Sequence, residues 1–277
     1  MIESGVSYFL LVVVFCVSMS SVLILNCVFV SSPTCPRTRN VERLDPISNQ
    51  WTPCASLPML SSGAVAFSIH GHLFCAAFEP IDLGHANAAT QTNVFEYSYI
   101  RDEWRDARDS FTPEALESID NCLVEEGALA VCHRTNTIYT VTNSEVSSIS
   151  INLIDGKVYC RNVRLLPRPH AYFSERQRLH SAVVVDEQLY VLGGDRHDAG
   201  SDPVPTARVI RLDPQSNSWV SCADMLETRA KLAVAELGEW ALKGSVGLKG
   251  TPREAADWPD NLENVQTFPF AGPACLF

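Results

Sequence analysis

The stretch that decides the fold is "SAVVVDEQLYVLGG", Ser181 to Gly194. It contains two short runs of strand-forming residues, "SAVVV" and "LYVL", separated by the polar triplet "DEQ". This pattern predicts a β-hairpin, with strands at Ser181–Val185 and Leu189–Leu192. The second strand ends at a pair of glycines, and because glycine has no Cβ, the pair permits a sharp exit and a close backbone approach.

A second hairpin follows the first. In "VIRLDPQSNSWVSC", Val209 to Cys222, two apolar runs flank Asp, Pro, Ser and Asn, which are turn-forming residues. Upstream, "GAVAFSIHGHLFCAA" (Gly63 to Ala77) and "GALAVCHRTNTIYTVTN" (Gly127 to Asn143) repeat the pattern of the first hairpin. Two hairpins per repeat predict a unit of four antiparallel strands. Helical periodicity is limited to a short stretch, Pro113 to Ser118.

The outer hairpin recurs along the chain. "VERLDPISNQWTPCAS" (Val41 to Ser56) aligns without gaps on "VIRLDPQSNSWVSCAD" (Val209 to Asp224), with ten identical positions. "NVFEYSYIRDEWRDA" (Asn93 to Ala107) and "SISINLIDGKVYCRN" (Ser148 to Asn162) have the same shape. One aromatic residue marks each copy, at intervals of 53, 55 and 60 residues: Trp51, Trp104, Tyr159 and Trp219. This period suits a propeller blade, in which the aromatic side chains would fill the wedge between neighbouring units.

The composition of the chain limits the classes of function that it can have. The formal charge is −11, from 21 basic and 32 acidic residues, which argues against a nucleic-acid surface. Ten cysteines without a C-x-x-C pair favour buried free thiols in a reducing compartment over a zinc site. "HGH", His70 to His72, offers two imidazoles without a third ligand, and a turn is the plainer interpretation. We predict no metal and no cofactor.

The N-terminal segment has a different character. Tyr8 to Val30 is 23 residues without a charge, long enough to cross a bilayer as a helix. The arginines that follow it, Arg37, Arg39 and Arg43, would leave the rest of the chain in the cytoplasm. Two interpretations remain: residues 8–30 are a membrane anchor, or the segment is a non-native start that stands in place of another domain.

The pattern of residues in the repeats resembles the kelch repeat. A pair of glycines follows an apolar strand, Tyr190 lies nearby, and Trp219 comes after "LDPQSN". The resemblance covers about Val41 to Leu237, and "RLDPQSNSW" is most similar to the kelch-like proteins, in which a BTB domain and a BACK region precede a six-bladed propeller. It implies an all-β chain: an incomplete or small kelch β-propeller of four-stranded antiparallel blades, with an N-terminal hydrophobic helix. The expected division is a hydrophobic segment at 1–40, kelch repeats at 41–237 and an irregular tail at 238–277.

The chain also departs from the family pattern. Nothing before Val41 resembles a BTB or BACK domain, and the repeats amount to three fairly complete units with a half unit at each end. A propeller typically needs four or more blades to close. The chain is therefore either a four-bladed closure made from the two halves or a fragment of something larger, and we favour the fragment. The glycine pair becomes Ala76–Ala77 in one unit and Thr142–Asn143 in another, which predicts a strained or shifted corner there.

The resemblance implies a cytoplasmic, non-catalytic protein-binding module, the substrate-recognition propeller of a kelch-like ubiquitin-ligase adaptor. A cullin-RING ligase would be a partner only if the full-length form has a BTB domain. The alternatives are a structural or actin-associated kelch protein and a membrane-anchored kelch protein with a cytoplasmic propeller. Some kelch propellers carry copper oxidase or isomerase sites, but no convergent set of His, Cys and Tyr ligands is visible here, and we predict that the chain is not an enzyme.

The candidate binding residues lie in and near "CRNVRLLPRPHAYFSERQRLH", Cys160 to His180, which links two units. In kelch propellers such connections lie on a rim, and arginines interleaved with aromatic residues are enriched at interface hot spots. The alternative is a solvated loop. The predicted partner-binding residues are Arg164, Arg168, Tyr172, Phe173, Arg176, Arg178 and Arg196.

Overall fold

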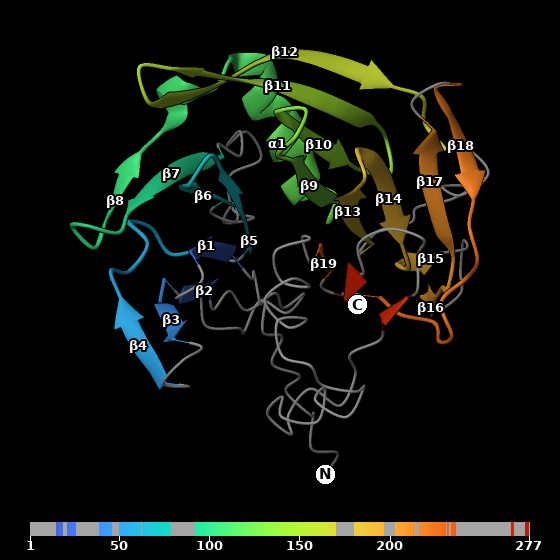
Figure 1. Ribbon diagram of the computed structural model, residues 1–277, viewed down its shortest axis with the longest axis horizontal. Helices are drawn as coiled ribbons and strands as arrows, with labels where there is room; N and C mark the ends of the chain where they lie inside the picture. The colour runs from blue at the N-terminus through green and yellow to red at the C-terminus, as the bar shows by residue number, and fades with distance from the viewer. Residues whose placement is uncertain are drawn as a thin grey trace, which may run out of the picture. The chain divides into compact units, whose positions relative to one another are not determined.

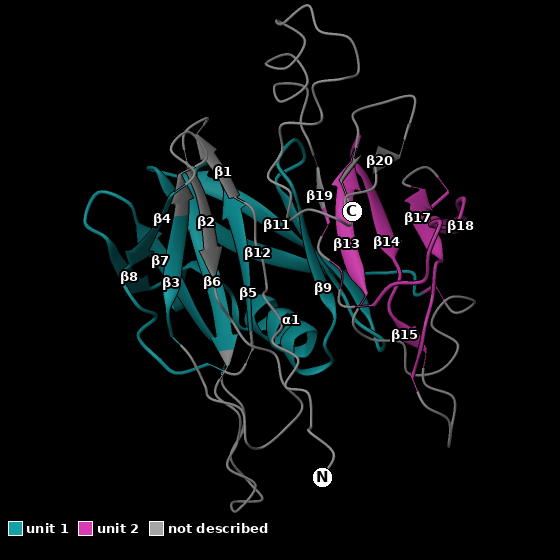
Figure 2. Ribbon diagram, turned by 90° about the horizontal axis from the view of Figure 1, so that it is seen from below, with its two compact units in different colours: residues 1–168 teal, residues 169–277 magenta. Residues whose placement is uncertain are grey.

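The structure is a computed structural model (Figure 1) in which the chain divides into two compact units, residues 1–168 and 169–277 (Figure 2). Both units consist mainly of antiparallel β-sheets. The expectation of a mainly β chain with four-stranded antiparallel units is therefore confirmed. The structure describes residues 15–18, 21–25, 39–45, 50–61, 63–78, 92–169, 180–196, 203–213, 216–230, 232, 234–236, 267–268 and 275–276.

The described residues of the first unit form three four-stranded sheets, and in each one neighbouring strands in the chain are neighbours in the sheet. The first sheet consists of β1 (Phe15–Ser18), β2 (Ser21–Leu25), β3 (Val41–Asp45) and β4 (Gln50–Cys54). The second consists of β5 (Gly63–Ile69), β6 (His72–Phe78), β7 (Asn93–Ser98) and β8 (Glu103–Asp106). The third consists of β9 (Ala128–Cys132), β10 (Thr137–Val141), β11 (Val146–Ile154) and β12 (Lys157–Leu166).

The second unit contains a fourth sheet with the same order. Its strands are β13 (Ser181–Val185), β14 (Gln188–Leu192), β17 (Val209–Asp213) and β18 (Ser218–Ser221). A two-stranded ribbon, β15 (Asp195–Arg196) with β16 (Val204–Pro205), is inserted between its second and third strands. The short strands β19 (Ala235–Glu236), β20 (Thr267–Phe268) and β21 (Cys275–Leu276) form a separate sheet in the order β19-β21-β20.

The predicted N-terminal helix is wrong where the structure describes the segment. Phe15–Ser18 and Ser21–Leu25 are strands, and β2 pairs with β3 from Val22↔Leu44 to Leu25↔Val41. The physical reason is that the segment is rich in Val, which favours strands, and that β3 needs a hydrogen-bonded neighbour. The rest of residues 8–30 lies outside the described part. Among the described residues, no helix combines the length and the apolar character that crossing a bilayer needs.

The three tryptophans that mark the repeats, Trp51, Trp104 and Trp219, occupy equivalent positions. Each forms the second residue pair from the loop of its outer hairpin: Leu44↔Trp51, Tyr97↔Trp104 and Leu212↔Trp219. Tyr159 forms the third pair, Asn152↔Tyr159, because its hairpin closes with a two-residue loop. We predicted that these aromatic side chains fill the space between neighbouring units. Trp104 does so, since it packs against the hydrophobic core of the first unit. Trp51, which is 47% exposed, does not.

The glycine pair marks a close approach between backbones. Gly193 and Gly194 have φ of 60° and 97°, in the region that favours glycine. The Gly194 N–H donates to the Arg229 carbonyl (2.8 Å), and the Gly193 N–H donates to the Arg208 carbonyl (2.9 Å). A Cβ on Gly193 would lie 2.4 Å from the Arg229 carbonyl oxygen. The first glycine is therefore required for space as well as for its backbone conformation.

At the two positions where other residues replace the glycine pair, the backbone is not strained in the way we predicted. Strand β6 runs straight through Ala76 and Ala77, neither of which has a positive φ, and pairs on to Phe78. The register places Ala77, not Ala76, at the position of Gly193. In the third sheet, the Thr142 hydroxyl accepts a hydrogen bond from the Glu145 N–H (3.0 Å) and closes the turn through its side chain.

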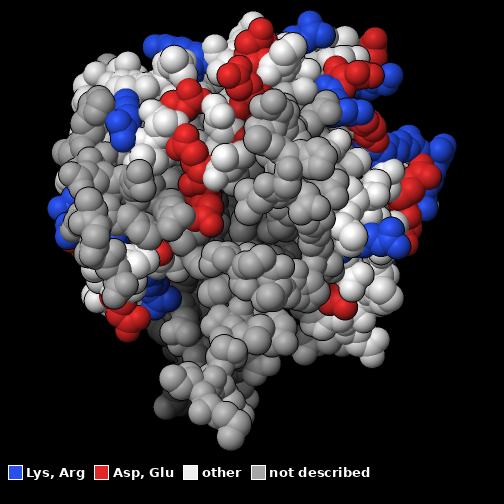
Figure 3. All heavy atoms as spheres, turned by 180° about the vertical axis from the view of Figure 1, so that it is seen from behind, with Lys and Arg blue, Asp and Glu red and all other residues white. Residues whose placement is uncertain are grey.

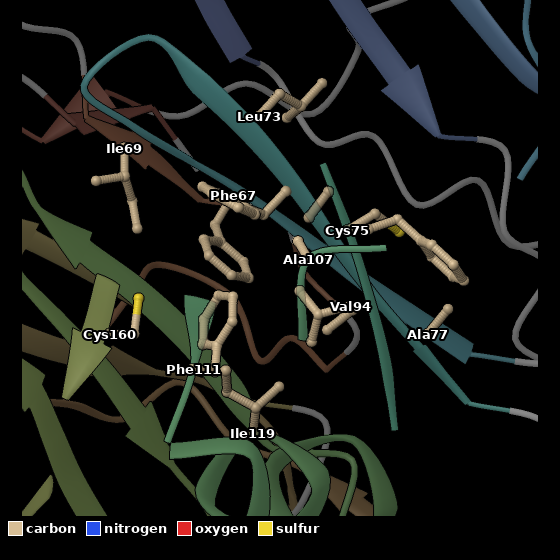
Figure 4. Packing of buried hydrophobic residues seen from close by; sticks show 14 of the residues in the cluster. Phe67, Ile69, Leu73, Cys75, Ala77, Val94, Ala107, Phe111, Ile119 and Cys160 are labelled. Carbon is tan, nitrogen blue, oxygen red and sulfur yellow. The ribbon is translucent and has the colours of Figure 1, made fainter. Parts of the chain in front are cut away.

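The helix α1 covers part of the hydrophobic core of the first unit. The predicted stretch Pro113–Ser118 is helical, and α1 extends it to Val124. Thr112 caps the helix through its hydroxyl, which accepts from the Ala115 N–H (3.4 Å). The buried face follows helical spacing and consists of Ala115, Ser118, Ile119, Cys122 and Leu123. Figure 4 shows Phe111 between Phe67 and Ile119, and the Phe111 ring meets the Phe74 ring edge-on, with 5.7 Å between the ring centroids.

Polar contacts join the first sheet to the second. The Trp104 indole N–H donates to the Ala55 carbonyl (2.9 Å), and an Asp102 carboxylate oxygen accepts from the Ala55 N–H (2.8 Å). The same oxygen accepts from the Tyr97 hydroxyl (2.6 Å). The Ala55 N–H first, and the Tyr97 hydroxyl second, hold the pKa of Asp102 below its usual range. Burial, with the Asp102 carboxylate second, raises the pKa of Tyr97.

Replacing Gly193 with alanine should destabilise the protein far more than the same change at Gly156. Gly156 also has a positive φ (71°), but nothing lies within 4 Å of its added Cβ, so Gly156→Ala should cost only the left-handed strain, about 1 kcal/mol. Gly193→Ala adds a clash with backbone, and we expect a total of about 3 kcal/mol or more. Thermal and denaturant unfolding measure both. Equal losses would contradict the close approach.

Asp102→Asn should lower stability by about 1 kcal/mol at neutral pH, because an amide is a poorer acceptor for the Ala55 N–H and the Tyr97 hydroxyl. Since the folded pKa of Asp102 is lowered, the stabilisation by its carboxylate is present above the unfolded value of about 3.9 and is lost as pH falls toward the folded pKa. The stability difference between wild type and Asp102→Asn should therefore shrink in acid. Asp109→Asn is the control, and a pH-independent difference would count against the assignment.

Candidate partner-binding surface

The outer hairpin of the third sheet carries the candidate surface. Its strands β11 and β12 have nine and ten residues. They are joined by Asp155 and Gly156, which both have a positive φ (51° and 71°), as a tight type I′ turn requires. Strand β12 is the last strand of its sheet (Figure 1). The hairpin therefore holds the arginines of β12 on a strand that is hydrogen-bonded to β11.

A β-bulge places two arginines on the same face. Arg161 lies opposite Ser150 and Arg164 lies opposite Ser148, so β12 has one extra residue between Ile149 and Ser150 of its partner. The extra residue is Asn162, whose φ is 55°. In a regular strand, residues three apart point to opposite faces. The bulge corrects this mismatch, and Arg161 and Arg164 project from the face that also carries Ser148 and Ser150.

The two arginines are exposed. The Arg161 guanidinium lies over the Tyr159 ring, 5.1 Å from its centroid, which orients the charge. Within the part of the chain that the structure describes, neither Arg161 nor Arg164 forms an ion pair, whereas four other arginines do: Arg101, Arg105, Arg108 and Arg229. On the face that Figure 3 shows, basic side chains lie in small groups beside acidic ones.

The outer edge of β12 is only partly covered. Phe111 forms a parallel bridge with Cys160, and the Thr112 N–H donates to the Cys160 carbonyl (3.1 Å). Among the described residues, no strand pairs with this edge beyond Cys160. The Cys160 thiol lies on the buried side, and burial raises its pKa to about 12. Leu165, further along the same strand, is 68% exposed.

The other predicted binding residues are spread over the chain. Arg168 is half-buried and follows β12, and Arg196 is exposed in β15 of the second unit. Tyr172, Phe173, Arg176 and Arg178 lie outside the described residues, and their role stays a prediction. The structure brings Arg164 together with Arg161, which we had not included among the binding residues.

The sequence contained a signal for this pairing. The inward-facing positions of β12 are Val158 and Cys160, which are buried, and then Val163, which is half-buried, so the alternation slips by one residue at Asn162. Asparagine tolerates the left-handed conformation better than most residues, and a slip in alternation at such a residue indicates a bulge.

The structure describes the surroundings of the histidine and cysteine candidates. His72 Nδ1 lies 2.5 Å from the Glu96 carboxylate on the neighbouring strand, and His70 lies in the turn with a φ of 48°. No group of three metal-binding side chains occurs among the described residues. The six cysteines whose side chains are described are free thiols: Cys54, Cys75, Cys122, Cys132, Cys160 and Cys222.

Comparisons with known proteins bear on the fold. A family profile, the Kelch motif, matches residues 178–226. The solved structure titled "Structure of YjhT" aligns with a TM-score of 0.52 at 11% identity, over 77% of this chain and 70% of that one. These findings support a kelch-repeat protein. The four-stranded sheets are consistent with a kelch propeller. No curated protein matches the chain.

The prediction that the chain is not an enzyme does not stand. A copper-bound fungal alcohol oxidase of the AA5 family is among its structural matches, at 15% identity and a TM-score of 0.44, over 69% of this chain and 50% of the oxidase. A scaffold of antiparallel sheets does not exclude catalysis. The reason is physical: a scaffold of stacked sheets sets no chemistry by itself, because catalysis depends on the side chains grafted onto it.

Asn162→Val should destabilise the protein by about 1–2 kcal/mol, because a β-branched residue resists a positive φ. Asn162→Gly should be neutral within about 0.5 kcal/mol, since glycine adopts that conformation freely. Unfolding of the two variants by denaturant measures the difference. If valine were tolerated as well as glycine, the bulge would not have the backbone conformation described above.

Proposed function

We propose that the chain is a protein-binding module that recognises its partner through the arginines of β12 and the segment after it. Kelch repeats generally mediate protein–protein interaction. The observation that carries the proposal is the pair Arg161 and Arg164, exposed on one face of a hairpin and without an ion pair among the described residues. Arginines of this kind form charge-assisted, bidentate hydrogen bonds with carboxylates, and they are enriched at hot spots.

The finer proposal is that this module selects substrates for a kelch-like ubiquitin ligase. The phrase "RLDPQSNSW", which is similar to the kelch-like proteins, lies within the matched Kelch motif. The free thiols of both units are in keeping with a reducing compartment such as the cytoplasm. Arg164 belongs to the first unit and Arg196 to the second, so we propose that each contributes to binding and test each separately.

The test compares the proteins that co-purify with the full chain and with single variants. Arg164→Glu reverses one exposed charge and should reduce the recovery of a specific partner by about tenfold, which corresponds to 1.4 kcal/mol. Arg196→Glu tests the second unit in the same way. Arg101→Glu is the matched control, because Arg101 is also exposed but lies beside Glu103 (3.6 Å). Thermal unfolding confirms that each variant is folded.

An identical set of partners for wild type and Arg164→Glu would overturn the proposed role of β12. For the ligase proposal, the identified partner should be more ubiquitinated when the chain is present than when it is absent. If a partner binds through Arg164 but its ubiquitination does not change, the proposed adaptor role is wrong, while the proposed protein-binding function still holds.

A further inference from the structure

We propose that the free edge of β12 around Val163–Leu165 binds an extended acidic peptide segment of a partner protein as an added antiparallel or parallel strand. This inference rests on the proposed protein-binding function and specifies its mode. The proposed binding element is the backbone edge of an outer strand, which is distinct from the rim loops.

The backbone argument starts from the ladder. In a two-residue hairpin, the residues that flank the loop, Ile154 and Lys157, exchange hydrogen bonds, and hydrogen-bonded pairs then alternate along the strands. The alternation directs the N–H and C=O groups of Val158 and Cys160 away from β11. The structure agrees, since the Cys160 carbonyl accepts from the Thr112 N–H on that side (3.1 Å).

Beyond the bulge the same alternation continues. Arg164 lies opposite Ser148, and its carbonyl faces β11, where the Ser148 hydroxyl donates to it (3.4 Å). The residues on either side, Val163 and Leu165, therefore direct their N–H and C=O groups to the outer edge. Among the described residues no strand pairs with them there. A row of backbone donors and acceptors of this kind is a template for an added strand.

The side chains indicate what kind of segment would add. Arg161 and Arg164 project from one face of β12, and Leu165, 68% exposed, projects from the other. An added strand alternates its own side chains between the same two faces. The best match is a segment in which acidic residues alternate with apolar ones, so that carboxylates reach the guanidinium groups and an apolar side chain packs on Leu165.

The overall charge of the chain favours a protein ligand over a polyanion. With a net charge of −11, the protein as a whole repels nucleic acid and anionic lipid surfaces at long range. A short acidic segment held by backbone hydrogen bonds requires only a local pair of arginines. The two arginines and the open edge lie within the same few residues of β12, which suits a ligand that uses both.

The test measures binding of short fluorescein-labelled peptides to the full chain by fluorescence anisotropy. One peptide alternates Glu with Val, a second has Lys in place of Glu, and a third keeps the Glu–Val sequence but carries N-methyl groups on alternate backbone nitrogens. The protein variants are Arg161→Gln/Arg164→Gln and the matched control Arg101→Gln/Arg105→Gln. The control arginines belong to the outer hairpin of the second sheet and lie beside Glu103.

We expect the Glu–Val peptide to bind, and the Arg161→Gln/Arg164→Gln protein to bind it about tenfold more weakly or worse. The Lys peptide and the N-methylated peptide should not bind, and the control variant should bind like wild type. Equal binding of the N-methylated peptide would overturn strand addition, and equal binding by the Arg161→Gln/Arg164→Gln protein would overturn the role of the arginines. No binding of the Glu–Val peptide would overturn the inference, while partners lost with Arg164→Glu would still support the protein-binding module.

Discussion

The burial of inner strands on both faces is the constraint on which the rest of the structure depends. Five consecutive residues of β6 are each 1% exposed or less: Leu73, Phe74, Cys75, Ala76 and Ala77. Because neighbours in a strand point to opposite faces, β6 must be covered on both sides. A single four-stranded sheet cannot provide that cover. Within the first unit, α1 and Phe111 provide part of it.

The outer strands are under a weaker constraint. Most residues of β4, β8 and β18 are exposed or half-buried, and side-chain hydrogen bonds take over from apolar packing there. At Ala55, the Asp102 carboxylate and the Trp104 indole satisfy both backbone groups of one residue. Such contacts position the outer hairpin without filling its surface. The inner strands thus contribute most of the stability, and the outer strands can vary their side chains and acquire a binding role.

Much of this arrangement could be predicted from the sequence, because it is local. The hairpins, the equivalent tryptophans and the helix start at Pro113 all follow from turn residues, alternation and capping. The N-terminal segment could not be assigned in this way. A run of apolar residues suits either a membrane helix or an inner strand buried on both faces, and the choice depends on a partner strand, β3, that lies sixteen residues further along the chain (Leu25 to Val41).

The candidate surface was also only partly predictable. Arg164 was identified from composition, but its neighbour on the same face depends on the bulge at Asn162, which is visible in the sequence only as a slip in alternation. The position of the glycine pair in the second sheet was likewise displaced by one residue, since the register places Ala77, not Ala76, at the position of Gly193. One residue of register exchanges the two faces of a strand, so composition can locate a functional segment long before it can say which side chains act together.

The bulge also bears on how β12 can carry an open edge without indiscriminate pairing. Edge strands are protected by bulges, by charged side chains and by covering segments. Strand β12 has all three: Asn162 interrupts the ladder, the arginines charge one face, and Phe111 and Thr112 cover Cys160. What remains is short, around Val163–Leu165, and is flanked by positive charge. A long apolar edge would accept any strand, whereas a short basic one discriminates in favour of acidic segments. The structural features that limit aggregation are therefore the same ones that would make the edge specific for acidic segments.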